Sequence, residues 1–137
     1  MSIEFTATPD SADINFLTQK IDAETPEFGP VYPFGFFLRD ENNHIVAGCN
    51  GFVIYGAIYT DQLWVDHRYR NTGLGRVLME QVHDYGREIG CTMATVATMS
   101  FQGAQEFYER LGYEVDFERK GYVNGSSCLF LKKELIT

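Results

Sequence analysis

The chain lacks several features that mark particular classes of protein. Its 137 residues contain no apolar run close to the ~20 residues that a membrane-spanning helix needs. The three cysteines, Cys49, Cys91 and Cys128, are odd in number and widely spaced, so they fit neither a disulfide framework nor a zinc-binding pattern. The polar residues Ser2 and Glu4 do not match the start of a signal peptide. We therefore expect a cytoplasmic protein that holds no metal and does not act on a membrane.

Basic residues are also scarce. The chain has 11 Lys and Arg against 19 Asp and Glu, which gives a formal net charge of −8 at pH 7. Such a charge disfavours nucleic acid and anionic membranes as partners. The exception is the segment 67–76, which holds His67, Arg68, Arg70 and Arg76. In an acidic protein this cluster indicates an anion site rather than a solvated face.

The chain is long enough for one domain with a real core, which we expect over residues 1–137. Hydrophobic periodicity predicts helices over residues 11–23, 75–89 and 102–111. It predicts strands over residues 4–8, 34–39, 45–55, 57–65, 92–98, 113–119 and 127–132. Asn124-Gly125 predicts a hairpin turn between the last two strands. This element order indicates an α/β protein with a mixed sheet.

Residues 63–79 form the most informative stretch of the sequence. An apolar strand ends at Val65, and Gly73 and Gly75 then open a helix. Unpaired N–H groups at a helix start attract anions, and glycines let the backbone approach a ligand closely. The sequence fits neither the Rossmann fingerprint nor the P-loop, because Arg76 and Val77 follow Gly75. We therefore predict an anion-binding loop of another type.

Two motifs resemble those of the GNAT superfamily of N-acetyltransferases. The hexapeptide 70–75, Arg-Asn-Thr-Gly-Leu-Gly, is similar to its Arg/Gln-x-x-Gly-x-Gly/Ala motif. The segment 107–113, Phe-Tyr-Glu-Arg-Leu-Gly-Tyr, resembles its Phe-Tyr-Glu-Lys-x-Gly-Phe segment, and Ala104 also matches. The ending 132–135, Lys-Lys-Glu-Leu, resembles that of a small bacterial subgroup. The resemblance covers the whole chain and is weakest before Phe34. It implies a mixed, mainly antiparallel central sheet flanked by helices, with acetyl-CoA as cosubstrate.

The resemblance also implies roles for particular residues. Strand backbone should pair with the pantetheine arm of the cosubstrate, at Leu63, Trp64 and Val65. Loop and helix amides should wrap its pyrophosphate, from Arg70, Asn71, Thr72, Gly73, Leu74, Gly75 and Arg76. The Tyr108 hydroxyl should protonate the leaving CoA thiolate, and a phenol with an ordinary pKa of ~10 is protonated at neutral pH. The alternative for Tyr108 is a core aromatic, the role we expect for Phe107 and Leu111.

The sequence departs from the family pattern in two places. The family often has Asn three residues before the alanine at 104, and here that position is Phe101. A side-chain contact to the cosubstrate is therefore lost, or passes to Gln102 or Ser100. Many members use a strand glutamate as general base, but the matching position falls near Tyr59. We interpret nearby Asp61 as a solvated edge residue and leave the base unassigned. We also expect His83 on a helix surface.

The predicted reaction is acetyl transfer from acetyl-CoA to a primary amine by direct attack in a ternary complex. The acceptor stays open between a small amine, an antibiotic, a peptide N-terminus and a protein lysine. One alternative is a non-catalytic module that senses acetyl-CoA, which would have no use for a positioned Tyr108. Another is a nucleotide-binding protein, but the loop lacks the lysine and hydroxyl residue that bind phosphate and magnesium. The oligomeric state is open, with a homodimer as one option.

Overall fold

The computed structural model describes residues 1–135, which divide into two compact units. The first unit is Met1–Val31, and the second begins at Tyr32. All strands in the described part of the chain belong to the second unit. None of the helices in residues 1–135 combines the length and the apolar character that a bilayer span requires.

The first unit consists of helix α1 (Ser11–Glu24) and the 3₁₀ helix η1 (Pro26–Phe28). The predicted start of α1 is confirmed, because the Asp10 side chain caps it and accepts a 2.8 Å hydrogen bond from the Ala12 N–H. The strand predicted over residues 4–8 is wrong. Residues 1–31 contain no other strand, so the backbone N–H and C=O groups of residues 4–8 would find no ladder partner within their own unit.

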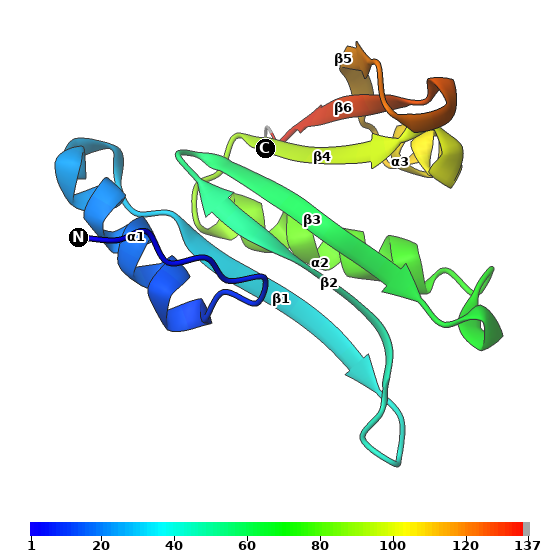
Figure 1. The fold of residues 1–137 in the computed structure, drawn as a ribbon. Helices are drawn as coiled ribbons and strands as arrows, with labels where there is room; N and C mark the ends of the chain where they lie inside the picture. Colours follow the sequence, from blue (N-terminus) through cyan, green and yellow to red (C-terminus); the bar gives the residue numbers. More distant parts are fainter. Residues whose placement is uncertain (136–137) are drawn as a thin grey trace. The chain divides into compact units, whose positions relative to one another are not determined.

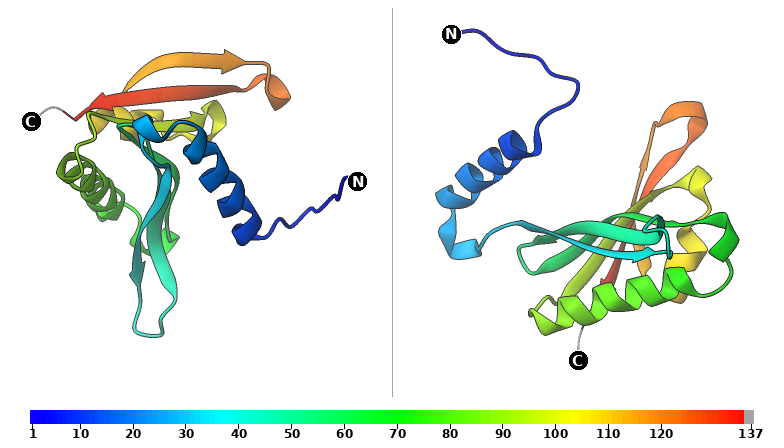
Figure 2. Two further views of the ribbon diagram at one scale, coloured as in Figure 1. Left: turned by 90° about the vertical axis from the view of Figure 1, so that its left-hand side faces the viewer. Right: turned by 90° about the horizontal axis from the view of Figure 1, so that it is seen from below.

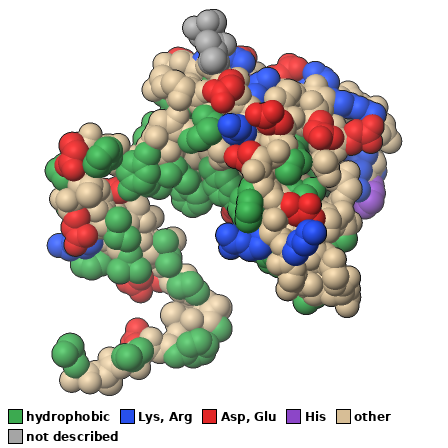
Figure 3. Space-filling model, turned by 90° about the horizontal axis from the view of Figure 1, so that it is seen from above, with side chains coloured by type: hydrophobic (Ala, Val, Ile, Leu, Met, Phe, Trp, Pro, Cys, Tyr) green, Lys and Arg blue, Asp and Glu red, His purple; other side chains and the backbone are tan. Residues whose placement is uncertain are grey.

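Helix α1 keeps its apolar side chains at the surface. Ile14, Leu17 and Ile21 recur at helical spacing, yet no residue of α1 is buried. Figure 3 shows hydrophobic side chains on the surface of this unit. The helix predicted from the spacing of these residues is confirmed, but their side chains form no hydrophobic core within residues 1–31.

The second unit is a six-stranded mixed sheet (Figure 1). Its strands lie in the order β1-β2-β3-β4-β6-β5. Strands β3 and β4 pair in parallel, and every other neighbouring pair is antiparallel. This is the mixed, mainly antiparallel sheet that was predicted. The strand bounds are β1 (Tyr32–Arg39), β2 (Ile45–Ile54), β3 (Ala57–Val65), β4 (Met93–Met99), β5 (Glu114–Lys120) and β6 (Ser127–Glu134).

Helix α2 (Leu74–Glu88) connects β3 to β4 and covers one face of the sheet, as Figures 1 and 2 show. Ile58 and Met79 are fully buried between the helix and the sheet. Burying each side chain of this size stabilises the fold by roughly 1.5–3 kcal/mol. The rest of this core comes from α2, the central strands and helix α3 (Gln105–Arg110), and includes Ala47, Cys49, Val82, Ala94, Val96, Tyr108, Leu129 and Leu131.

The buried face of α2 includes a residue that was expected at the surface. His83 is buried at 4% exposure, whereas Ile89 is 39% exposed, so the prediction of His83 on the helix surface is wrong. The cause is Gly86, where an added Cβ would lie 2.9 Å from the Ile58 side chain and 3.1 Å from Leu135. Because Gly86 has no side chain, the sheet packs against this side of the helix.

The C-terminal elements follow the prediction with one change. The helix predicted over residues 102–111 divides into the 3₁₀ helix η3 (Ser100–Gln102) and helix α3 (Gln105–Arg110). Gly103, with φ +70°, separates them. Strands β5 and β6 form the predicted hairpin, and Asn124 and Gly125 in their connection both have positive φ.

Strand β3 carries a β-bulge in its pairing with β2. Asn50 lies opposite Gln62 and Gly51 opposite Thr60, so Asp61 is the extra residue. The two backbones approach so closely here that a Cβ on Gly51 would lie 1.8 Å from the Tyr59 carbonyl oxygen. The bulge therefore requires glycine at this position.

The three cysteines are free thiols, and all of them are buried. Cys49 lies in β2 within the core, and burial raises its pKa to about 11. Burial also raises the pKa of Cys91. These thiols behave as small apolar core groups rather than nucleophiles.

Candidate active site

Strands β3 and β4 separate part of the way along their length. Their parallel pairing covers only residues 57–60 of β3 and 93–96 of β4, ending at Thr60 and Val96. Strand β3 continues to Val65 and β4 to Met99 without pairing to each other, and Figure 1 shows them diverging toward the start of α2 and α3. One edge of β3 is therefore open to an extended ligand, as the prediction for residues 63–65 requires.

The start of α2 lies beside this opening. Gly73 is the N-cap residue, with φ +87°, and no side chain caps the helix. The first α-helical hydrogen bond runs from the Val77 N–H to the Gly73 carbonyl, so the preceding N–H groups have no partner within the helix. These free N–H groups and the helix dipole form an anion-binding site.

The loop between β3 and α2 is held in shape by its own side chains. Asp66 caps the 3₁₀ helix η2 (His67–Tyr69) and pairs with the Arg68 guanidinium at 3.2 Å. The Arg70 Nε donates a 2.9 Å hydrogen bond to the Val65 carbonyl oxygen. The Thr72 hydroxyl donates to the Tyr69 carbonyl oxygen. Two of the predicted anion-site residues, Arg70 and Thr72, therefore also fix the loop backbone.

A cleft of about 630 Å³ joins these parts. It brings together nine of the ten predicted cofactor-binding residues, namely Leu63, Trp64, Val65, Arg70, Asn71, Gly73, Leu74, Gly75 and Arg76. Thr72 does not line it. Neither do His67 and Arg68, so half of the basic cluster seen in the sequence lies away from the cleft.

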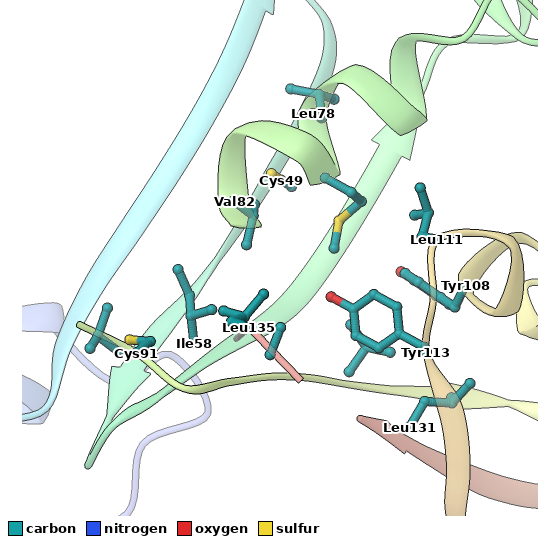
Figure 4. Close-up of a cluster of buried hydrophobic side chains, with 14 of the residues drawn as sticks. Cys49, Ile58, Leu78, Val82, Cys91, Tyr108, Leu111, Tyr113, Leu131 and Leu135 are labelled. Atoms are coloured by element: carbon teal, nitrogen blue, oxygen red, sulfur yellow. The ribbon is translucent and has the colours of Figure 1, made fainter. Parts of the chain in front are cut away.

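Tyr108 lies in the core beside the cleft and does not line it. Its ring packs edge-to-face against Phe107, with ring centroids 5.2 Å apart. It packs in the same way against Tyr113 at 5.5 Å, and Figure 4 shows these two tyrosines in the core. Burial, with smaller contributions from Cys49 and Tyr59, raises its pKa to about 12. Within residues 1–135 the Tyr108 hydroxyl makes no hydrogen bond, so its proton is free to donate. This position fits both roles considered for Tyr108, that of a core aromatic and that of the acid for the leaving thiolate.

Of the three residues considered for a further cosubstrate contact, Gln102 lines the cleft. Its side-chain oxygen accepts hydrogen bonds from the Thr98 hydroxyl at 3.0 Å and the Met99 N–H at 2.8 Å. The Ser100 hydroxyl accepts a hydrogen bond from the Ser127 N–H, and Phe101 is 67% exposed. The Gln102 amide N–H₂ is therefore the group left for a ligand.

The sequence analysis missed several cleft residues, including Tyr69, Phe107 and Arg110. Phe107 was expected in the core, but it is only half-buried and also forms a wall of the cleft. Arg110 follows Phe107 by three residues on a helix and therefore shares its face. That spacing is a signal that could have identified Arg110.

The lining suits a long ligand with a phosphate group. The space above Gly73 is open, because an added Cβ there would have no atom within 4 Å. Gly75 is packed tightly instead, since its Cβ would lie 3.2 Å from the Phe107 ring. The Thr60 hydroxyl, in the last β3–β4 residue pair, is buried and has no hydrogen-bond partner within residues 1–135. Thr60 does not line the cleft, so the groups that acetyl-CoA would use here are the open strand edge and the free helix N–H groups.

Comparison with known proteins decides the family. A family model described as the acetyltransferase (GNAT) family matches residues 7–113. The chain belongs to this family. A curated blasticidin-S acetyltransferase from Streptomyces morookaense is 33% identical to this GNAT protein over 110 residues, which is 80% of each chain. This protein is therefore an acetyl-CoA-dependent N-acetyltransferase, as predicted from the two motifs.

Solved structures share the GNAT fold. A Bacillus cereus acetyltransferase superposes with a TM-score of 0.74 and 23% identity, covering 96% of this chain and 97% of its own. The ribosomal-protein-S18-alanine N-acetyltransferase of Escherichia coli has a TM-score of 0.68 and 17% identity, covering 96% of this chain and 93% of its own. The fold is shared by proteins named for different acceptors, so it does not specify the acceptor of this GNAT protein.

Proposed function

We propose that this GNAT protein transfers the acetyl group to a primary amine of a small molecule, by direct attack in a ternary complex. The observation that supports this most strongly is the separation of β3 and β4 beyond Thr60 and Val96, directly beside the uncapped start of α2. An acyl-CoA bound along the free edge of β3 would have its phosphates at the helix and its thioester between the strands. The 33% identity to blasticidin-S acetyltransferase favours a small acceptor, and blasticidin S is the first compound to test.

The proposed roles of the loop residues depend on backbone groups. Leu63, Trp64 and Val65 pair with the pantetheine arm through their backbone, and a β3 N–H near Val65 polarises the thioester carbonyl. The amides of residues 70–76 bind the pyrophosphate. The Gln102 amide N–H₂ supplies the additional side-chain contact. The family model matches residues 7–113 and so includes residues of both compact units. This supports one acetyltransferase domain over residues 1–137.

Tyr108 is the proposed acid. The amine nitrogen bonds to the acetyl carbon, the carbon–sulfur bond breaks, and Tyr108 donates its proton to the departing sulfur. The proton that the nitrogen loses passes to water, and Tyr108 regains a proton from solvent before the next turnover. Its pKa of about 12 keeps it protonated throughout the physiological range. Its unbonded hydroxyl and its contact with cleft residue Phe107 support this role. Holding the two substrates in reactive positions provides much of the remaining rate enhancement.

The test is free-thiol release from acetyl-CoA in the presence of blasticidin S and a panel of primary amines, with mass spectrometry of the products. A product heavier by one acetyl group, formed together with thiol, supports the proposal. The non-catalytic sensor remains the alternative. It predicts saturable acetyl-CoA binding with no amine-dependent thiol release across the whole panel.

A further inference from the structure

A second, smaller pocket of about 200 Å³ lies between α2, the end of α3 and strand β6. It adjoins the cleft, because Arg110 and Leu111 line both. Four of the α2 residues that line it recur at spacings of four, three and four, which places them on one face of the helix: Arg76, Glu80, His83 and Arg87. The proposed roles of the cosubstrate and acceptor leave this pocket unused.

The lining of the pocket is basic, against the balance of the whole chain. The chain has 11 Lys and Arg against 19 Asp and Glu. In the pocket, four basic residues meet two acidic ones, namely Arg76, Arg87, Arg110 and Lys133 against Glu80 and Asp84. Positive charge gathered in a concave site raises the local concentration of anions.

The two acidic residues hold their arginine partners only weakly. Arg76 pairs with Glu80 at 3.6 Å, and Arg87 pairs with Asp84 at 3.4 Å. In each pair at least one side chain is more than half exposed, so water screens the attraction and the pair contributes little free energy. Both guanidinium groups can therefore turn to a bound anion at small cost.

Lys133 has no carboxylate of its own. Within residues 1–135 its ammonium group forms no ion pair. The residue is half-buried, and its Nζ atom lies over Gly112 in the turn after α3, where an added Cβ would be 2.5 Å away. Withdrawing an ammonium group from water without a counter-charge is unfavourable. An anion in the pocket would remove that cost.

His83 supplies a hydrogen-bond donor at the same end of the pocket. It is almost fully buried, and its Nε2 atom lies 2.8 Å from the Tyr113 hydroxyl oxygen. A tyrosine that donates to Nε2 leaves the proton of the neutral ring on Nδ1. In the described part of the chain Nδ1 has no hydrogen-bond partner, although His83 lines the pocket. After burial, Lys133 and Arg87 do most to lower the pKa of His83, so both cations face the ring.

This end of the pocket is separate from the pyrophosphate site proposed at Gly73. His83 follows Gly73 by ten residues on α2. At a rise of ~1.5 Å per residue, the two positions are about 15 Å apart along the helix axis. The ribose that joins the pyrophosphate of CoA to its 3′-phosphate does not span that distance. An anion at His83 is therefore a second ligand.

We propose that Lys133, Arg87 and the Nδ1 atom of His83 form a second anion site, which binds a small phosphate and regulates cosubstrate binding. Cationic side chains and N–H donors make strong charge-assisted hydrogen bonds to phosphate oxygens. Arg76 and Arg110 line both the pocket and the cleft, and exposed ion pairs on their own helices are the only ones they form within residues 1–135. A phosphate in the pocket attracts both guanidinium groups away from the cleft and so weakens CoA binding. The inference goes beyond the proposed function, because it needs no acceptor.

Inorganic phosphate is the probe, titrated calorimetrically into the full chain at an ionic strength held constant with chloride. We expect saturable binding. Lys133→Gln should weaken it at least about tenfold, as loss of a charge-assisted hydrogen bond implies. Lys132→Gln is the matched control, because Lys132 is also half-buried, does not line the pocket and points to the other face of the sheet. It should change phosphate affinity by less than about twofold.

CoA titrations with and without saturating phosphate test the regulation. Each ligand should weaken the other by the same factor, about fivefold or more, because coupling between two sites is reciprocal. Dephospho-CoA, which lacks the 3′-phosphate, should show the same factor. If CoA displaces phosphate and dephospho-CoA does not, the pocket holds the 3′-phosphate of the cosubstrate and the inference is overturned. Absence of saturable phosphate binding, equal effects of the two Gln variants, or a CoA affinity unchanged by phosphate would also overturn it.

Discussion

The Nε2 atom of His83 on α2 lies 2.8 Å from the hydroxyl oxygen of Tyr113, which directly precedes β5. Both side chains are almost fully buried, at 4% exposure each. Burial, with further contributions from Lys133 and Arg87, lowers the pKa of His83 to about 4. Burial raises the pKa of Tyr113, which therefore stays protonated and donates to His83. The pair ties α2 to the C-terminal part of the core as two neutral groups.

This pair makes the stability of the fold depend on pH. The unfolded chain binds a proton at His83 near pH 6.5, and the native state binds it only near pH 4. The unfolding free energy should therefore be at its full value above pH 6.5 and fall by about 3 kcal/mol as pH drops to 4. Denaturant unfolding across this range measures it. His83→Gln, which keeps a hydrogen-bonding group, should flatten the dependence.

His44→Gln is the control for that experiment, because the His44 side chain is 78% exposed in the β1–β2 turn. It leaves the buried His83–Tyr113 pair intact, so the fall in stability that His83 causes should remain. If the unfolding free energy of His83→Gln still falls as the pH drops, His83 is protonated to the same extent in the native and unfolded states.

Acetyl-CoA and CoA should raise the melting temperature, and ATP and NAD should do so far less, since only a native-state ligand stabilises by mass action. Gly73→Val should remove most of the CoA effect, because its side chain would enter the open space at the start of α2. Thermal unfolding with each ligand measures this.

The control variant is Gly121→Val. Gly121 also has positive φ, at +98°, with no atom near an added Cβ, but it lies in the β5–β6 connection. Both variants should lose intrinsic stability from backbone strain, whereas only Gly73→Val should lose the response to CoA. If CoA raised the melting temperature of both variants equally, the pyrophosphate would not bind at Gly73.

Tyr108→Phe should lower kcat by roughly 10²–10⁴-fold with little change in acetyl-CoA affinity, because general acid catalysis acts in the transition state. Steady-state kinetics and CoA binding measure the two effects separately. The pKa of about 12 also predicts no alkaline loss of activity from this group below about that pH. Tyr113→Phe is the neighbouring control and should mainly affect stability. A loss of only a few-fold in Tyr108→Phe, with chemistry rate-limiting, would leave Tyr108 a packing residue.

Gly51→Ala should destabilise the protein by about 3 kcal/mol or more, because the added methyl group would overlap the Tyr59 carbonyl and force the bulge apart. Gly35→Ala is the comparison, since its new methyl group comes too close only to the ring of Phe37, which can turn, and lies at an ordinary contact distance of 3.6 Å from the Cys49 carbonyl oxygen. Denaturant midpoints measure both. A similar loss of stability in the two variants would mean that the bulge tolerates a side chain at position 51.

Local signals were enough to predict most of the second unit and its loop. The start of α2 follows from Gly73, and the final hairpin from Asn124 and Gly125, because all three have a positive φ that few other residues adopt. Apolar runs identified the strands because a buried strand needs apolar side chains. These features depend on neighbouring residues alone.

The errors came from features that depend on partners distant in sequence. Residues 4–8 alternate as a strand does, but alternation cannot supply a ladder partner. His83 was assigned to the surface by its polarity, and its partner Tyr113 lies 30 residues away. The bulge in β3 depends on Gly51 in another strand, and it shifts the register of the residues that follow Thr60. Sequence alternation alone could not reveal that shift in register.

The burial of Cys49, Cys91 and Cys128 affects how the enzyme is best assayed. A colorimetric thiol reagent should react slowly with the folded chain, so the signal during turnover comes from CoA and needs little background subtraction. Denaturant added at the end of a run should then release three further equivalents per chain. Each assay would thereby carry its own measure of enzyme concentration, and early reaction of those equivalents would reveal which variants unfold during the measurement.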